Sequence, residues 1–196
     1  MTNIDISESV IRQMATHCEN CAQLRWAVAD CRDLKDFTDG QFDVVIEKAT
    51  IEVFFVAESQ GALWSADSIG GEAMESVRRM ADEIVRVLRP SNGQFFSISF
   101  TAPHFRKNLF AKMFACSDDD GGSSEPSMKI VNVHSLGDHF HFYLYHLVND
   151  QSRQPVDIFS YEPPKMTLLQ RTSAVLKEDD DDHLQQTDHF LFSISP

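Results

Sequence analysis

The chain has 196 residues, 42% of them hydrophobic, and its 30 acidic against 17 basic side chains give a formal net charge of −13. This size and composition suit one globular domain, and so acidic a surface disfavours nucleic acid and anionic lipid, because both bind clustered Lys and Arg. No apolar run reaches the length of a membrane span, and residues 1–5 lack the basic and apolar regions of a secretory signal. The charge instead favours a basic protein partner, with solubility alone as the alternative.

The first half of the chain alternates strand and helix patterns. Residues 3–6 read as a short strand, and Ser7 then has the chemistry of an N-cap for a helix with an apolar stripe at helical spacing. Residues 24–28 alternate as a strand that runs on to Asp30. Residues 41–48 hold a nearly continuous apolar run, which is typical of a strand covered by helices on both faces of a parallel sheet.

The second half begins with the clearest helix, over residues 72–89, which Pro90 and Gly93 end. The other predicted elements are a strand at 94–100, a helix at 103–114, two strands at 129–134 and 139–148 joined by a hairpin turn, and a last strand at 190–194. This order predicts one α/β domain over residues 1–196, a doubly wound sheet with an antiparallel C-terminal edge. Residues 149–187 are predicted to form a flexible acidic loop within it; docking of a basic protein by the acidic run 178–182 is the alternative to a purely solvated loop.

Polar side chains follow three of the predicted strands. Ligands of an open α/β sheet bind beyond the carboxyl ends of the strands, where Asp5, Asp30 and the pair Glu47-Lys48 fall. The Asp5 carboxylate suits the two hydroxyls of a ribose, and Asp30 with the backbone N–H of Cys31 suits the amine and ring nitrogen of a purine. The alternative is that each acid caps the following helix or turn. Three such acids at successive strand ends favour a nucleoside site.

These residues resemble a known family, the class I S-adenosylmethionine-dependent methyltransferases, and among them the lysine methyltransferases of translation elongation factor 1-alpha. The resemblance lies in Asn3–Ser7, Leu24–Leu34, Phe42–Glu52 and Arg86–Gly93, and more specifically in Glu47–Thr50, Thr101–Arg106 and His139–Tyr145. It implies a Rossmann-like sheet, S-adenosyl-L-methionine as cofactor and a basic protein substrate, with elongation factor 1-alpha as the expected one. It also implies that Asp5 binds the ribose, that Ile6 packs beside the adenine, that Asp30 and Cys31 read the adenine edge, and that Lys48 lies near the cofactor.

The chain departs from the family pattern in two places. Relatives carry Gly where this chain has Ala49 and Asp where it has Glu52, and a Cβ at position 49 would hinder a close backbone approach. The family's first strand and glycine-rich loop would precede Met1, and the family strand order 3-2-1-4-5-7-6 makes that strand central. We therefore expect a truncated chain in which the two flanking strands lack a partner, at about 1–3 kcal/mol for each buried unsatisfied group, and which binds the cofactor poorly.

No catalytic base is assigned. Glu47 and Glu52 are candidates for positioning a substrate amine, with a helix N-terminal acid as the alternative for Glu52, and His104 is a candidate substrate contact with a helix-start role as its alternative. His139 and His141 share a strand face with Tyr143 and Tyr145. Packing is favoured over zinc binding there, and aromatic rings that line the substrate channel are the other alternative.

Cysteine usage points to the reducing cytoplasm. Cys18, Cys21, Cys31 and Cys116 are too few and too uneven for a disulfide framework, and the Cys18-x-x-Cys21 spacing lacks a second ligand pair, so we expect no metal. We expect a monomeric enzyme. Two alternatives stay open: a small-molecule methyltransferase on the same fold, and a non-catalytic remnant or interaction module.

Overall fold

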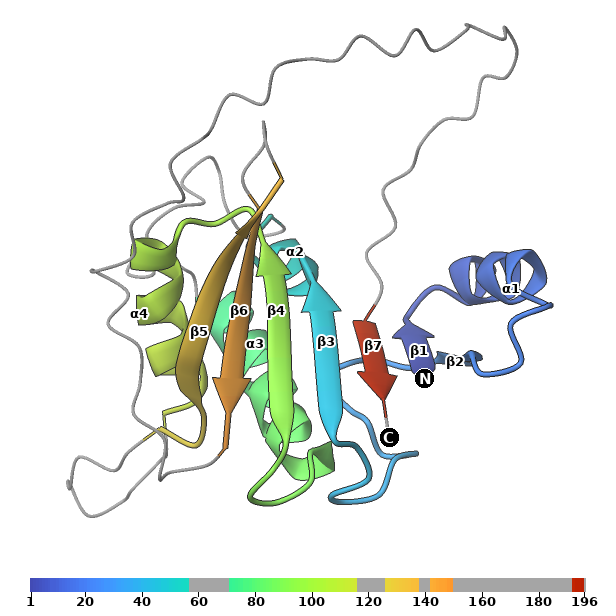
Figure 1. Ribbon diagram of the computed structural model, residues 1–196, viewed down its shortest axis with the longest axis horizontal. Helices are drawn as coiled ribbons and strands as arrows, with labels where there is room; N and C mark the ends of the chain where they lie inside the picture. The colour runs from blue at the N-terminus through green and yellow to red at the C-terminus, as the bar shows by residue number, and fades with distance from the viewer. Residues whose placement is uncertain (57–70, 116–125, 138–141, 150–191, 196) are drawn as a thin grey trace, which may run out of the picture.

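The structure is a computed structural model in which residues 1–56, 71–115, 126–137, 142–149 and 192–195 are described (Figure 1). The elements in these ranges are, in chain order, β1 (Thr2–Asp5), α1 (Glu8–His17), β2 (Arg25–Val28), β3 (Val44–Lys48), α2 (Thr50–Val56), α3 (Gly71–Val87), β4 (Gln94–Ser99), α4 (Pro103–Met113), β5 (Lys129–Leu136), β6 (Phe142–Val148) and β7 (Phe192–Ser195). Nearly all of the predicted acidic loop, together with Cys116, His139 and His141, lies outside the described residues.

The strands form one seven-stranded sheet in the order β2-β1-β7-β3-β4-β6-β5 (Figure 1). β1 pairs with β2 in parallel and β3 pairs with β4 in parallel. β6 runs antiparallel to both β4 and β5, so the predicted hairpin and the predicted antiparallel edge are confirmed. The strands therefore form a mixed α/β sheet, and its parallel strands bring their carboxyl ends to one edge.

The centre of the sheet differs from the sequence expectation. β7 lies between β1 and β3 and runs antiparallel to both, with Ile194 opposite Thr2 on one side and opposite Val45 on the other (Figure 1). The prediction that the two flanking strands lack a partner is therefore wrong, since the C-terminal strand supplies one. β7 had been predicted only as a strand, and its four residues carry no sequence signal that would place it at the centre.

The helices are built as their sequence patterns predict. Ser7 caps α1, with its Oγ accepting the Val10 N–H at 3.4 Å, and Glu8 lies in the first turn, where the helix dipole favours an acid. The buried residues of α3 recur at helical spacing and pack into the main core; they are Ala73, Val77, Met80, Ala81, Ile84 and Val87. None of the helices in the described ranges is long and apolar enough to cross a membrane.

The described helices cover the central strands on one face. α3 and α4 lie behind β3, β4, β5 and β6 in Figure 1, whereas α1 packs beside β1 and β2 at the other end of the sheet. Accordingly, β4 alternates between fully buried and half-buried residues, and Val45 in β3 is buried while Val44 and Ile46 are half-buried. The apolar run at 41–48 predicted helices on both faces of the sheet. Within the described residues, helices cover only one face of the central strands.

Candidate functional site

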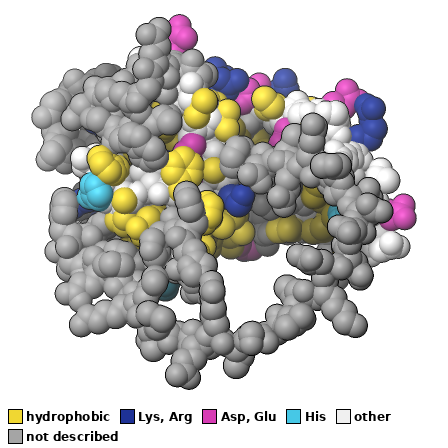
Figure 2. Space-filling model, turned by 90° about the horizontal axis from the view of Figure 1, so that it is seen from above, with side chains coloured by type: hydrophobic (Ala, Val, Ile, Leu, Met, Phe, Trp, Pro, Cys, Tyr) yellow, Lys and Arg dark blue, Asp and Glu magenta, His cyan; other side chains and the backbone are white. Residues whose placement is uncertain are grey.

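The candidate site lies at the carboxyl ends of the parallel strands. Asp5 ends β1 and pairs in register with Val28, the last residue of β2, so Asp5 and Asp30 follow neighbouring strands. Strands in a sheet are about 4.8 Å apart, which brings the two acids into one small region. Figure 2 looks onto the edge at which β3 and β4 end, where hydrophobic side chains gather with charged ones between them.

Asp5 accepts a local backbone hydrogen bond and lies beside an exposed apolar side chain. Its Oδ1 accepts the N–H of Ser7 at 2.7 Å, which is the capping role weighed as an alternative. An ionised carboxylate has about four lone-pair sites, so this bond leaves capacity for hydroxyl donors. Ile6, the next residue, is 72% exposed and offers an apolar surface at the same place.

Asp30 is held by a neighbour that sequence reasoning did not single out. Arg32 donates from Nη2 to Asp30 Oδ2 at 2.7 Å, and from its backbone N–H to Oδ1 at 2.9 Å. These hydrogen bonds keep the pKa of Asp30 below its usual range, so the carboxylate is ionised at neutral pH. The Arg32 guanidinium also lies 5.5 Å from the Phe54 ring centroid and donates to Ser76 at 3.3 Å. Any ligand amine at Asp30 must share this carboxylate with Arg32.

The Cys31 side chain is buried at 7% exposure, and burial raises the pKa of its thiol to about 12. The thiol is therefore neutral and not a nucleophile. What Cys31 can offer a ligand is its backbone N–H, and that role stays a prediction from the sequence.

Lys48 ends β3 and is exposed, but β7 separates β3 from β1. Lys48 and Asp5 are therefore two strand spacings apart, about 10 Å across the sheet. The next residue, Ala49, is buried and has a φ of 55°, the left-handed region that favours glycine. The chain therefore has Ala, where the family carries Gly, at a position whose backbone conformation favours Gly.

Glu47 and Glu52 are core residues in the structure, at 0% and 7% exposure. Both carboxylates face Arg106 of α4, and Glu52 lies in the first turn of α2, as its alternative role required. A role for Glu47 and Glu52 in positioning a substrate amine stays a prediction, and within the described residues their partner is Arg106. The sequence had not predicted α2, the helix that buries Glu52.

The remaining sequence candidates divide between packing and exposure. Tyr145 is fully buried and its OH donates to the Thr101 carbonyl at 2.5 Å, which is the packing role. His104 is exposed at the start of α4 and its ring centroid lies 4.0 Å from that of Phe105, so it stays a candidate substrate contact. Cys18 and Cys21 are free thiols, and no group of three or more His, Cys, Asp or Glu side chains in the described ranges could hold a metal.

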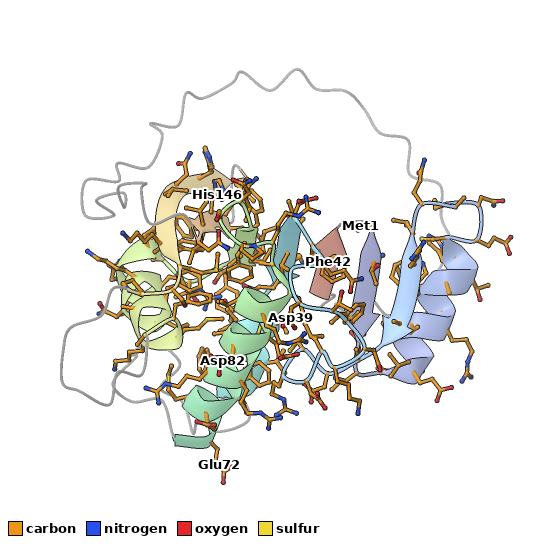
Figure 3. All side chains as sticks on the ribbon, turned by 90° about the horizontal axis from the view of Figure 1, so that it is seen from below. Met1, Asp39, Phe42, Glu72, Asp82 and His146 are labelled. Carbon is orange, nitrogen blue, oxygen red and sulfur yellow. The ribbon has the colours of Figure 1, made fainter. Side chains whose placement is uncertain are left out.

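A second arginine stabilises the loop that carries the site. Arg86 of α3 donates to the carbonyls of Leu34 and Phe37, each at 2.9 Å, and pairs with Asp39 and Glu83, each at 2.7 Å. Figure 3 shows Asp39 beside α3, on the connection from β2 to β3. This connection begins at Asp30 and Cys31, so Arg86 helps to fix the residues expected to face the adenine. The sequence signal for this role is weak, because the partners are some 50 residues away.

Residues 1–96 match the methyltransferase domain family. The chain is 33% identical over 146 residues to mouse (Mus musculus) EEF1A lysine methyltransferase 4, covering 74% of this chain and 51% of that protein. It is 35% identical over 112 residues to the Bos taurus protein of the same name, covering 57% of this chain and 41% of that protein.

A further curated protein and a solved structure also match. The Xenopus laevis eEF1A lysine and N-terminal methyltransferase is 31% identical over 110 residues, covering 56% of this chain and 14% of that protein. The crystal structure of the PH0226 protein from Pyrococcus horikoshii OT3 aligns with a TM-score of 0.46 at 17% identity, over 75% of this chain and 70% of that one.

Through this domain match and its α/β sheet, the chain is similar to the class I S-adenosylmethionine-dependent methyltransferases. Within that family it resembles EEF1A lysine methyltransferase 4. The chain spans about half the length, or less, of these two relatives.

Proposed function

We propose that this chain acts as a protein-lysine N-methyltransferase that uses S-adenosyl-L-methionine and modifies a translation elongation factor in the cytoplasm. The observation that carries the proposal is the placement of Asp5 and Asp30 at the carboxyl ends of two neighbouring parallel strands. The names of the mouse and bovine relatives support the substrate class. The formal net charge of −13 suits a basic protein partner.

The residues at this edge fit the nucleoside part of the cofactor. In the proposal, Asp5 accepts hydrogen bonds from the ribose hydroxyls with the lone pairs that Ser7 leaves, and the exposed Ile6 side chain packs beside the adenine. Asp30 accepts from the adenine amine while Arg32 keeps it ionised, and the Cys31 N–H donates to a ring nitrogen. In the same proposal, Lys48 at the end of β3 lies near the cofactor and the substrate channel.

When bound, the cofactor supplies a methyl group on a sulfonium, which a neutral lysine amine takes up by direct displacement. With the cofactor bound, displacement of the sulfide by the amine would give a methylated ammonium, which would lose its proton to solvent. What the protein must do is align the amine with the methyl group and exclude water. No residue need act as a strong base for this transfer. The exposed His104 and Phe105 rings at the start of α4 are placed to contact the substrate.

Methyl transfer to purified elongation factor 1-alpha tests the substrate class. Incubation of the chain with S-adenosylmethionine and the factor should add methyl mass to one lysine-containing tryptic peptide. A parallel reaction with a pool of small amines and no protein substrate should give no methylated product. Methylation of small amines alone would identify a small-molecule enzyme, and methylation of neither substrate would overturn the proposed activity of this chain.

A further inference from the structure

A buried charge cluster joins the ends of β3 and β4 to the two helices that follow them. It consists of Glu47, Glu52 and Arg106, with side chains 0%, 10% and 1% exposed. The Arg106 Nη2 atom lies 3.2 Å from the Glu52 carboxylate and 3.5 Å from Glu47 Oε1. The Arg106 guanidinium also lies 5.3 Å from the Phe110 ring centroid within α4. One guanidinium is thus shared by two carboxylates in the core.

The cluster is hydrogen-bonded to the backbone beside Lys48. Glu47 Oε2 accepts the Thr50 N–H at 2.9 Å, which closes the turn containing Lys48 and the left-handed Ala49. Ser97 in β4 donates its hydroxyl to Glu47 Oε1. The backbone turn that carries Lys48 is therefore oriented by the Glu47 carboxylate, which Arg106 holds in place.

The same guanidinium reaches the connection between β4 and α4. Glu52 accepts from the hydroxyls of Ser99 and Thr101, the latter at 3.4 Å. Ser99 Oγ in turn accepts the Thr101 N–H at 2.9 Å, and the Thr101 carbonyl accepts the Tyr145 hydroxyl. This connection leads directly into the exposed His104. Two separate segments of the candidate site, one at Lys48 and one at Thr101, thus depend on one arginine.

We propose that Arg106 is a positioning residue, which sets the relative placement of the Lys48 turn and the Thr101–His104 connection for methyl transfer. The proposal rests on the proposed function for its catalytic consequence. Its physical reason is that two ionised carboxylates buried side by side repel each other unless they share a cation or one of them takes up a proton. A neutral side chain at position 106 would let them move apart, carrying the two segments with them.

The protonation of the cluster gives a signature that packing alone would not. Burial raises the pKa of Glu47 to about 7, against the opposing effect of Arg106. The titratable and charged groups that face Glu47 in the described residues are Arg106 from α4, Glu52 from α2 and Cys31 after β2. Because the unfolded value is lower, this group stabilises the fold most at acid pH, and the stabilisation is lost as pH rises through about 7.

The experiment follows the amide resonances of Thr50 and Thr101 by NMR in the wild type, Arg106→Met, Arg106→Lys and Glu47→Gln, with Arg89→Met as a surface control. The wild-type Thr50 amide should titrate with a midpoint near pH 7, and Glu47→Gln should abolish that titration. Arg106→Met should shift both amides and lower kcat about tenfold or more with little change in KM for the protein substrate. Arg106→Lys should restore part of each effect, because it keeps the charge and loses the planar fork.

Two outcomes would overturn the assignment. One is an Arg106→Met variant with unshifted Thr50 and Thr101 amides; if that variant does not fold, the other is an Arg106→Lys variant in which both amides are unshifted although the planar fork is lost. Both are read without cofactor, so they test Arg106 separately from the activity. A wild type with the expected titration and no methyl transfer would instead overturn the proposed function, and with it the catalytic consequence of Arg106.

Discussion

A chain that ends at His189, and so lacks β7, is expected to lose most of its free energy of unfolding. β7 pairs with β1 through Thr2–Ile4 and with β3 through Val44–Glu47, so its removal strips both strands of a partner at the centre of the sheet. Each buried backbone group left unsatisfied costs about 1–3 kcal/mol, and total stability is typically only about 5–15 kcal/mol. Urea unfolding followed by far-UV circular dichroism measures the loss.

A chain that ends at Ser195 is the matched control and should unfold at the wild-type urea concentration, since it keeps all of β7. Ile194→Pro is a milder probe, because proline removes one N–H from the ladder and is not tolerated in a central strand. The urea midpoint of Ile194→Pro should fall between those of the chains that end at His189 and at Ser195. Equal urea midpoints for the chains ending at His189 and Ser195 would show that β7 does not stabilise the sheet.

Replacement of Arg86 by Met is expected to lower the free energy of unfolding by about 2–4 kcal/mol. The substitution leaves the carbonyls of Leu34 and Phe37 without their donor and Glu83 without its counter-ion. The hydrogen bonds from Arg86 also keep the pKa of Glu83 below its usual range, so this pair stabilises the fold above the unfolded pKa and loses that effect on acidification. Arg86→Met should therefore also flatten the acid limb of the stability profile.

Arg89→Met is the control for this prediction. Arg89 pairs with Asp43 at 2.5 Å, but its side chain is 53% exposed and that of Asp43 is 41% exposed. Exposed ion pairs contribute about 0–1 kcal/mol, so Arg89→Met should move the urea midpoint only slightly. If Arg86→Met and Arg89→Met destabilised the protein equally, the connection from β2 to β3 would not depend on Arg86.

The sequence predicted the elements whose signals are local. Ser7 with the helix after it, the periodic stripe of α3 and the turn at Gly137 between β5 and β6 are all readable from short windows. α2 was missed because Thr50–Val56 is short and rich in β-branched and aromatic residues, which favour a strand. Placement of β7 depends on a partner some 190 residues away in the chain, and no local pattern specifies that.

The candidate site follows the same division. Asp5 and Asp30 could be predicted to lie together, because carboxyl ends of parallel strands share an edge. The bond from Arg32 to Asp30 has a spacing of two residues and was open to prediction from the sequence. The sharing of Arg106 by Glu47 and Glu52 was not, since it depends on how α4 packs against the sheet. Ala49 fits neither group: it is a single-residue departure from the family pattern, and the structure gives this residue a positive φ.

Calorimetric titration with S-adenosylhomocysteine tests the central claim, that this edge of the sheet is a cofactor site. The account predicts weak, saturable binding to the 196-residue chain. Asp5→Asn should weaken it about tenfold or more, roughly 1.4 kcal/mol, whereas Asp43→Asn, at the opposite end of β3, should leave it unchanged. Absence of binding to the wild type, or equal affinity of the wild type and Asp5→Asn, would contradict the account.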